Sequence, residues 1–516
     1  MNSRPASRVV LVLSSCFALL IFLSASATSP PLFQQSAKLL AGDGATRHDF
    51  GLSLALEGNT AAIGAPGWNN EVGSYTGAVY LFNLVGQQWT QAQRLQATDR
   101  AAFTAFGSAV ALDGDTLAVG ALGNNQGTKL DAGAVYIFNG SGQNWSESVK
   151  LSPADLVEYN LFGASVDLAG NTLLAGAWKS DGGTNEAAYV FTRTGNTWTQ
   201  QGKLSAPEAP ADINFGAAVA LAGDIALVGA PGDFQRADQT GAVYVYTRDD
   251  HIWSFAEKLE PGDGEPGDNF GCAIDIDGQQ AVIAACRAYE ALPRPGYAYI
   301  FIREGSRWVQ RARLEPDTDE RPFEVDSVSI DGDQVALGSK NAFGPLMDFA
   351  GTVYLFHRVS GNNWNEVPAV QPDDIRNDAE FGRSVALSGN KLLAGAPEIN
   401  DYMDDGPGAA YYFTAASQEM TVRLYLPAVM TPRQPATQLE SLIAYVRDDD
   451  IFTATPIGTR LTNLTRTAEP ETEPAWSPDG RQLVFVRWPA AELVVMDADG
   501  SNQRVIPTPG VEYISS

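Results

Sequence analysis

The sequence predicts an all-β fold, and three observations narrow this fold class to a seven-bladed β-propeller. First, one segment recurs seven times at spacings of 53 to 58 residues, and self-similarity at a nearly fixed period marks a repeat architecture. Second, each copy contains four short strand-like runs, as a propeller blade does. Third, the last copy lacks its fourth run, and a matching run precedes the first copy. The copies open on Phe50, Phe106, Phe162, Phe215, Phe270, Phe323 and Phe381.

The second copy shows the four runs most clearly. Residues 106–112 alternate small and branched side chains, Asp113-Gly114 follows, and 116–121 form a second apolar run. An Asp-Gly pair between two such runs predicts a two-residue hairpin, and a type I′ turn requires positive φ at both central residues. After about ten residues, the aromatic and β-branched run 133–138 predicts a third strand. Residues 145–151 then predict a fourth.

Two further positions recur in register with the phenylalanines. A Trp lies six residues before a Leu or Val in six copies: Trp89, Trp145, Trp198, Trp253, Trp308 and Trp364. A Gly precedes the third strand in six copies: Gly77, Gly133, Gly241, Gly296, Gly351 and Gly408. The Trp residues invite a sugar-stacking role. Because a Trp buries about 150–250 Å², we instead interpret one at the same place in each blade as packing between neighbouring blades.

Ring closure is predicted from the two ends of the array. The seventh copy runs from Phe381 to Phe413 and contains neither the Trp nor the final strand. Residues 33–39 (FQQSAKL) carry an aromatic residue six positions before a Leu, ahead of the first copy. We therefore predict that residues 33–40 complete the last blade, which leaves no open edge between the first and last blades. The predicted propeller covers residues 33–413.

Residues 1–27 have the pattern of a secretory signal peptide. Arg4 and Arg8 precede an apolar core from Val9 to Leu23, and Ala25-Ser26-Ala27 is a small-residue cleavage site. The apolar core is short for a spanning helix, which needs about 20 residues, so an uncleaved anchor is the alternative. The run Leu13 to Cys16 weakly resembles a lipoprotein box. The prediction is a secreted or cell-envelope protein with no membrane insertion beyond this signal.

The chain is strongly acidic, with a formal net charge of −27. Removal of the signal peptide takes away two Arg and gives −29. Such a charge repels nucleic acid and anionic membranes. Solubility is the simplest interpretation, and binding of cations or of a basic partner is the alternative.

Two cysteines remain after the predicted cleavage, Cys272 and Cys286. In a regular two-residue hairpin their positions have opposite parity, which would put the side chains on opposite faces. A disulfide needs Cβ atoms about 3.8 Å apart. We therefore predict two free buried thiols.

The predicted strand order sorts the loops onto two faces of the disc. The turns after strands one and three are short, whereas the connections after strands two and four are about ten residues long. The long connections share one face, and binding usually resides on such variable loops. They are rich in carboxylates, for example Asp43, Asp49, Asp373, Asp374 and Asp378.

The pattern FG…GAP at 50–66, with GAP again at 229–231 and 395–397, resembles the FG-GAP repeats of the integrin α-subunit head. It resembles more closely the exported bacterial FG-GAP proteins with short hairpins. The resemblance implies a seven-bladed propeller and, loosely, adhesion or ligand binding, because one fold hosts many functions. The sixth copy departs from the pattern, since Phe323 is followed by Glu324.

Integrin-type blades carry calcium in a D-x-D-x-D-G loop, and the seven copies have only tight turns in that position. Calcium could still bind the long acidic loops. The candidate ligands are Glu398, Asp401, Asp404, Asp405, Asp263 and Asp268. The alternative interpretation is hydrated acidic loops with Asp and Gly turn chemistry.

The C-terminal part has a different pattern. Residues 414–440 break the period and read as a linker, in which 424–426 could form a short docking strand. Residues 441–516 include WSPDG at 476–480 and resemble a single repeat of TolB-like periplasmic propellers, in which this turn joins two strands. One blade cannot bury its own faces. We therefore expect a truncated product, or a structural spacer with a second propeller after the linker.

The sequence does not predict an enzyme. Its three histidines, His48, His251 and His357, occupy unrelated repeat positions and cannot converge on a triad or a zinc site. No nucleophile elbow or phosphate loop is present. We expect a monomeric, non-enzymatic protein that presents acidic loops to a protein or glycan at the cell surface. A calcium-dependent or carbohydrate-active exoprotein is the alternative.

Overall fold

The structure is a computed structural model. It describes residues 32–45, 47–69, 72–178, 185–207, 213–232, 240–286, 296–317, 324–342, 350–376, 378–397, 406–416, 443–447, 450–454, 462–465, 471–476, 482–487 and 492–505. The signal peptide predicted at 1–27 and most of the predicted linker, 417–440, lie outside these residues. Among the described residues, no helix is long and apolar enough to cross a membrane.

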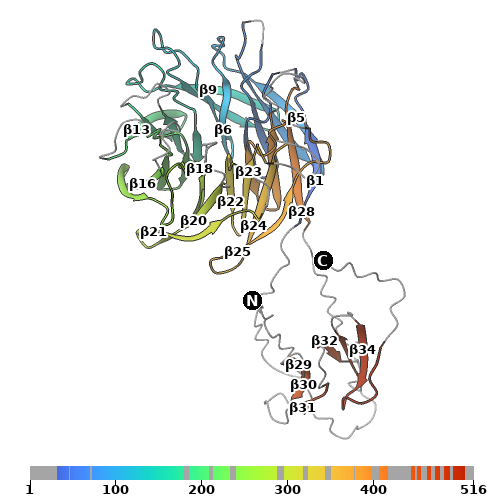
Figure 1. The fold of residues 1–516 in the computed structure, drawn as a ribbon. Coiled ribbons are helices and arrows are strands. Elements are labelled where there is room, and N and C mark those ends of the chain that lie inside the picture. The colour runs from blue at the N-terminus through green and yellow to red at the C-terminus, as the bar shows by residue number, and fades with distance from the viewer. Residues whose placement is uncertain are drawn as a thin grey trace. The chain divides into compact units, whose positions relative to one another are not determined.

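Seven four-stranded antiparallel sheets occupy the described part of residues 32–416 (Figure 1). The first blade contains β2 (Ser53–Glu57), β3 (Thr60–Ala65), β4 (Ala78–Val85) and β5 (Gln88–Leu95). The second contains β6 (Phe106–Asp113), β7 (Thr116–Ala121), β8 (Ala134–Ser141) and β9 (Asn144–Leu151). The third contains β10 (Val166–Ala169), β11 (Thr172–Ala177), β12 (Ala187–Thr194) and β13 (Thr197–Leu204).

The remaining blades follow the same order. The fourth contains β14 (Val219–Ala222), β15 (Ile225–Ala230), β16 (Ala242–Asp249) and β17 (Ile252–Leu259). The fifth contains β18 (Phe270–Asp277), β19 (Gln280–Ala285), β20 (Tyr297–Glu304) and β21 (Arg307–Leu314). The sixth contains β22 (Ser327–Asp331), β23 (Gln334–Ser339), β24 (Thr352–Ser360) and β25 (Asn363–Val370). The seventh contains β26 (Val385–Ser388), β27 (Lys391–Ala396), β28 (Ala409–Ala416) and β1 (Leu32–Leu39).

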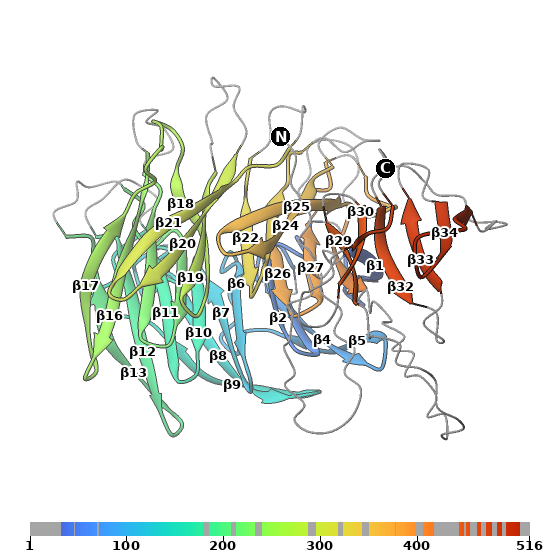
Figure 2. The same ribbon diagram turned by 90° about the horizontal axis from the view of Figure 1, so that it is seen from below.

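The innermost strands make a closed ring. Each of β2, β6, β10, β14, β18, β22 and β26 contacts the next, and β26 contacts β2 (Figure 2). The predicted closure is confirmed, because β1 pairs antiparallel with β28 from Leu39↔Ala410 to Leu32↔Ala416 (Figure 1). The fold is therefore a β-propeller whose last blade is completed by a strand from the start of the described chain.

In the six blades where it is described, the repeated phenylalanine is buried in the packing of the blade. Phe106 is fully buried and meets Tyr136 and Phe138 of the same blade edge-on, at ring-centroid distances of 5.5 and 5.9 Å. Edge-to-face aromatic pairs contribute about 0.5–1.5 kcal/mol beyond the area they bury. Two aromatic residues of the blade's third strand thus pack against the one phenylalanine ring at the start of its first strand.

The hairpin between strands one and two differs in detail from the prediction. Asp113 pairs with Thr116, so that Gly114 and Asp115 are the central residues of a two-residue turn. Gly114 has a φ of +58°, whereas the φ of Asp115 is not positive. The two-residue hairpin is confirmed, but the type I′ conformation is wrong. The reason lies in the neighbouring blade: Asp113 stays in the strand, where its carboxylate accepts a hydrogen bond from the N–H of Gly170.

The prediction of two free thiols is wrong, because Cys272 and Cys286 form a disulfide with a Cα–Cα distance of 6.1 Å. The parity argument assumed a regular ladder. The pairing of β18 with β19 is instead irregular between Phe270 and Ile274, and Cys286 lies one residue beyond the end of β19. Gly271, with a φ of +93°, permits this irregularity next to Cys272.

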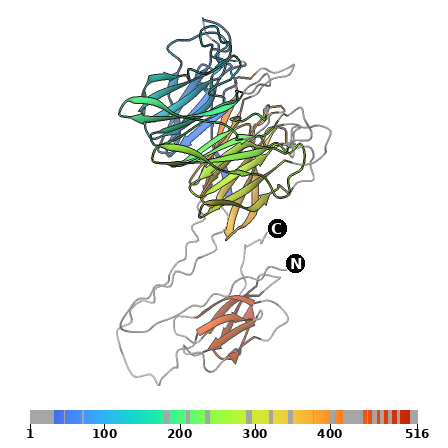
Figure 3. The same cartoon turned by 90° about the vertical axis from the view of Figure 1, so that its left-hand side faces the viewer.

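The C-terminal unit is a separate compact body (Figure 3). It contains β29 (Ile443–Arg447), β30 (Asp450–Ala454), β31 (Thr462–Asn463), β32 (Glu471–Trp476), β33 (Gln482–Arg487), β34 (Glu492–Asp497) and β35 (Arg504–Val505). The first three form one sheet and the last four another, with a small core of Ile451, Leu483, Phe485, Val494 and Met496. Strands β32 and β33 pair antiparallel across the predicted WSPDG turn. The likeness to a TolB repeat stays a prediction.

Candidate functional site

The propeller has one face of short turns and one face of long connections, which we call the long-loop face. Its loops follow the second and fourth strand of each blade. Those of the first two blades are described most completely: 66–69 with 72–77, 96–105, 122–133 and 152–161. This face is the candidate binding surface, and the question is which of its side chains are free to meet a ligand.

Much of the acidity of this face is neutralised within the propeller. In the second blade, Asp99 accepts a hydrogen bond of 2.6 Å from the hydroxyl of Tyr136 and forms an ion pair of 2.7 Å with Lys150. The Lys150 ammonium also lies 5.3 Å from the centre of the Tyr136 ring. Burial raises the pKa of Asp99, but the hydrogen bonds from Lys150 and Tyr136 outweigh it, so that the net pKa lies below its ordinary value.

The same arrangement recurs around the ring. The aspartate always lies seven residues before the blade's phenylalanine, and its cationic partner comes from the outermost strand. The pairs are Asp43–Arg94, Asp99–Lys150, Asp155–Lys203, Asp263–Arg313 and Asp374–Lys38. The last pair, at 2.8 Å, joins the closing strand β1 to the loop before the seventh blade. These five carboxylates serve the fold, and their fixed distance from the phenylalanine is a signal in the sequence that could have identified them.

The predicted calcium ligands fall into two groups. Glu398, Asp401, Asp404 and Asp405 lie outside the described residues. Asp263 pairs with Arg313 at 3.0 Å. Asp268 is fully buried, where the Tyr297 hydroxyl and the N–H of Glu265 donate to it. Within the described ranges, no three His, Cys, Asp or Glu residues are grouped to hold a metal ion. Calcium binding therefore stays a prediction, and the partners of Asp263 and Asp268 do not favour it.

The recurring tryptophans pack between blades. Trp145 of the second blade is 5% exposed and lies in the cluster formed by Val79 and Leu95 of the first. Trp198 and Trp308 occupy the matching clusters at the second-third and fourth-fifth junctions. Trp89 meets Tyr412 of the seventh blade edge-on at 5.1 Å. The interpretation as inter-blade packing is confirmed for these positions, so their rings are not available to a sugar.

The three histidines are placed in unrelated surroundings. His48 is buried, its Nδ1 accepts a hydrogen bond of 3.1 Å from the N–H of Ala45, and burial lowers its pKa. His251 lies in the turn between β16 and β17 with a φ of 69°, and His357 lies on β24. The three histidines therefore belong to different blades and do not form one cluster.

The mouth of the central channel is lined by the start of the first strand of every blade. The cavity there has a volume of ≈ 250 Å³. Four serine hydroxyls in its wall donate to carbonyl oxygens of the following blade: Ser53 to Gly107, Ser165 to Gly216, Ser327 to Gly382 and Ser384 to Gly51, at 2.6–2.9 Å. These hydroxyls link neighbouring blades, so the hydrogen bonds of the channel wall stabilise the closed ring.

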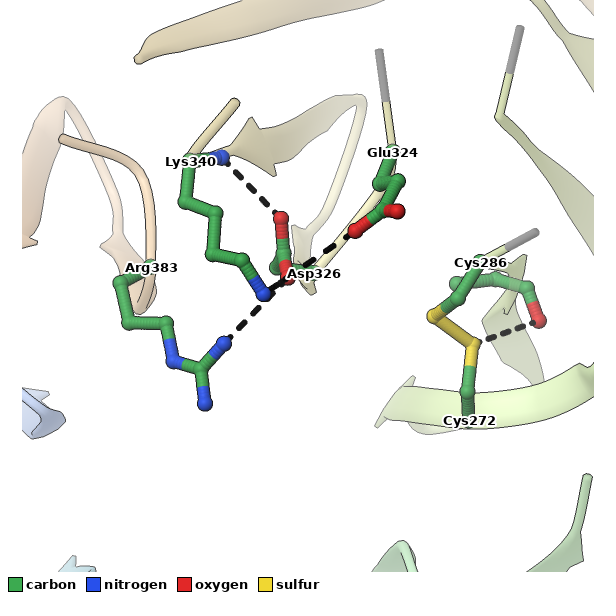
Figure 4. Close-up of a disulfide and its surroundings, with 7 residues drawn as sticks. Cys272, Cys286, Glu324, Asp326, Lys340 and Arg383 are labelled. Atoms are coloured by element: carbon green, nitrogen blue, oxygen red, sulfur yellow. Dashed lines mark hydrogen bonds and ion pairs between the residues drawn. A yellow bond between two sulfur atoms is a disulfide. The ribbon is translucent and has the colours of Figure 1, made fainter. Parts of the chain in front are cut away.

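One sector of this mouth is charged (Figure 4). Asp326, only 10% exposed at its side chain, pairs with Lys340 at 2.8 Å and with Arg383 at 3.4 Å, and Glu324 lies 4.0 Å from Lys340. Figure 4 shows Lys340 and Arg383 pointing toward Asp326, beside the Cys272–Cys286 disulfide. The two acidic and two basic side chains compensate one another's charge. Removing one partner of a buried pair would leave an uncompensated ion.

The loops of the long-loop face are held in defined conformations by hydrogen bonds between them. The N–H groups of Phe103 and Ala105 donate to the carbonyls of Ser74 and Tyr75, each at 2.9 Å. One blade later, the N–H of Tyr159 donates to Leu130 at 2.9 Å. These ladders turn apolar side chains outward. The exposed ones are Val72, Tyr75, Phe103, Leu130 and Val157, at 39–66% of full exposure.

Sequence reasoning missed this apolar group. The rings of Tyr75 and Phe103 lie nearly parallel, at an interplanar angle of 17° and a centroid distance of 6.4 Å. They come from different loops, 28 positions apart in the sequence. Only the pairing of the two loops brings them together, and no periodic signal marks them.

Comparison with known proteins identifies the repeats. Segments 33–82, 89–138, 145–191, 198–246, 253–301 and 364–413 match the family described as FG-GAP repeat. The matched segments begin with the outer strand of one blade and end with the third strand of the next. The interval 302–363, which holds the divergent sixth copy, is not among them. No protein with a curated description is similar enough to the chain to count as a match.

Two solved structures are similar to parts of this chain. The β-propeller domain of Cps50 (Swd1) from Myceliophteria thermophila is 11% identical, with a TM-score of 0.47, over 74% of this chain and 100% of that one. A protein from Lactobacillus plantarum is 13% identical, with a TM-score of 0.43, over 68% of this chain and 99% of that one.

Proposed function

The chain belongs to the FG-GAP repeat family, and on this premise we propose that it is an exported or cell-surface protein that binds another molecule through its long-loop face. It acts as a monomer and without catalysis. The FG-GAP propeller suggests a protein-binding or adhesion-type module. Proteins with these repeats are typically extracellular or surface-exposed and generally not enzymes.

The disulfide supports export. Cysteine pairs form and persist in oxidising compartments and are rare in the cytosol. Cys272 and Cys286, the two cysteines that follow the predicted signal peptide, are joined to each other. A signal peptide at residues 1–27 would deliver the chain to such a compartment.

The exposed apolar group on the long-loop face is the observation that carries the proposal. Large apolar side chains that protrude from ordered loops cost solubility and add nothing to the core, and clustered patches of this kind mark interaction sites. By contrast, the carboxylates expected to serve as the binding surface are largely engaged: Asp43, Asp99 and Asp155 pair with cations of the same propeller. The proposed contact surface is therefore centred on the exposed apolar side chains, above all the adjacent rings of Tyr75 and Phe103.

The experiment measures binding of the purified full chain to isolated cell envelopes from the producing organism. Phe103→Asp places a charge in the centre of the apolar group, and we expect it to weaken binding at least tenfold. Ile252→Asp is the matched control, because Ile252 is 67% exposed, like Phe103 at 66%, but lies at a short turn on the other face. Equal effects of the two substitutions, or none from Phe103→Asp, would argue against the long-loop face.

A further inference from the structure

Tyr75 and Phe103 form an aromatic platform, by which we mean these two rings alone. Their side chains are 44% and 66% exposed, and the planes are within 17° of parallel. The backbone beneath them is fixed, since the N–H of Tyr75 donates to Asn69 Oδ1 at 2.8 Å and the two loops bond to each other. A binding partner therefore meets two rigidly supported ring surfaces, and few rotamers have to be ordered on contact.

The platform is maintained at a cost to the fold. Tyr75 and Phe103 have φ values of 53° and 62°, in the left-handed region that disfavours a bulky side chain. Phe103 lies three residues before its blade's phenylalanine, and the same position in the fifth blade is Gly267, with a φ of +84°. The backbone of this loop thus accepts glycine without strain. The same left-handed conformation recurs three residues before the blade's phenylalanine at Arg47, Tyr159 and Asp378. The conformation therefore belongs to the repeat, and the largely exposed phenylalanine ring is what distinguishes this loop.

The charges around the platform indicate the chemistry of the partner. The chain as a whole carries −27, which repels anionic polymers. Next to the platform, however, Asp99 is neutralised by Lys150, and in the following loop Asp155 is neutralised by Lys203. These two aspartates are thus paired within the propeller, and the site offers two flat aromatic ring faces. Rings of neutral sugars suit such a surface, because their C–H faces pack on aromatic rings while their hydroxyls remain hydrated.

We propose that the Tyr75–Phe103 platform binds a neutral polysaccharide. This inference rests on the proposed function of the long-loop face and names its partner. The recurring tryptophans, which we interpreted as inter-blade packing, contact neighbouring blades, whereas the two rings of the platform reach solvent.

The test is affinity electrophoresis of the full chain through gels that contain a neutral polysaccharide (hydroxyethyl cellulose, xyloglucan, galactomannan or dextran) or an acidic one (alginate or polygalacturonate). We expect retardation in at least one neutral gel and none in the acidic gels. Phe103→Gly and Tyr75→Ala should each weaken that binding at least tenfold. Phe103→Gly should leave the melting temperature unchanged or raise it, because it removes the strain, so lost binding cannot be ascribed to unfolding. Ile252→Ala is the control that keeps full retardation.

Three results would overturn the inference: no retardation in any neutral gel, retardation only in acidic gels, or retardation that survives Phe103→Gly. Envelope binding that is lost in Phe103→Asp but is not accompanied by binding to any neutral polysaccharide would leave the proposed function standing and point to a protein partner. If the unmodified chain bound neither cell envelopes nor any polysaccharide, the proposed function would be wrong as well.

Discussion

The carbonyl oxygen of Gly51 lies where a side chain on Gly395 would have to be. Gly51 belongs to the Phe-Gly pair of the first blade and Gly395 to the Gly-Ala-Pro of the seventh, so the two halves of the repeat motif meet across the seam of the ring. The hydroxyl of Ser384 donates to the same carbonyl at 2.6 Å. Equivalent contacts join Gly64 to Gly107, Gly120 to Gly163, Gly176 to Gly216, Gly229 to Gly271 and Gly338 to Gly382. The motif is a contact between neighbouring blades.

Gly395→Ala should therefore destabilise the propeller. The new methyl group overlaps the Gly51 backbone, which cannot rotate away as a side chain would. Forcing extra volume into a packed site costs about 1–3 kcal/mol. Gly202→Ala is the control, because a Cβ there would meet only the Trp253 ring at 3.8 Å. Chemical denaturation of both variants checks the prediction, and equal stabilities would contradict it.

Removal of residues 32–39 should open the ring. The deletion exposes the edge of β28 and removes the buried Leu39 and the Lys38–Asp374 ion pair. We expect a lower melting temperature and concentration-dependent association, since an open strand edge pairs with other chains. A synthetic peptide of sequence LFQQSAKLL should restore the melting temperature and a scrambled peptide should not. Failure of the peptide to bind would show that closure contributes little.

The disulfide should stabilise the junction between the fifth and sixth blades. At this junction Ala284 replaces the first of the two glycines. Asp326 replaces the second, because its N–H donates to the Gly338 carbonyl as the glycine N–H does in other blades. The cystine packs in the same cluster as Ala284 and Val325. For a loop of this length, 14 residues of separation, a disulfide contributes about 3 kcal/mol. The double variant Cys272→Ala/Cys286→Ala should lose that amount in denaturant unfolding. A reducing agent should destabilise the parent but leave the double variant unaffected.

Asp167 should make stability depend on pH. Burial, together with the nearby Asp275 carboxylate, raises its pKa to about 7, although the N–H groups of Leu221 and Leu168 donate to it. Because the folded state binds this proton more tightly than the unfolded chain, whose ordinary value is 3.8, the contribution to stability is complete below about pH 4 and is lost as the pH rises to about 7.

The variant Asp167→Asn removes this titration. The stability of the parent relative to the variant should fall between pH 4 and 7, by at most about 1.4 kcal/mol per pH unit, and stay constant above pH 8. Urea unfolding of both proteins across this range measures the difference. A constant difference would mean that Asp167 is ionised throughout.

Local and periodic features were predictable because each is repeated six or seven times. The phenylalanine, the two-residue hairpin and the Trp-to-Leu spacing identified the blade, and the strand ahead of Phe50 identified the closure. Asp43, Asp99 and Asp155 carry an equally regular signal, seven residues before each phenylalanine, but composition alone suggested a ligand-binding role, since the cation that pairs with each one lies on a distant strand.

Features that depend on irregular strand pairing or on contacts between loops could not be predicted in this way. The Cys272–Cys286 bridge exists because the ladder beside Gly271 is irregular, and a parity argument presumes regularity. The Tyr75–Phe103 platform exists because two loops bond to each other; the pairing recurs one blade later, but the pair of aromatic residues does not. The sequence by itself determined the blades, their order and the seam, since strand periodicity and turn chemistry act over a few residues. Only the tertiary structure decided which acids are neutralised and which rings reach solvent, because those outcomes depend on contacts between segments that no local pattern relates.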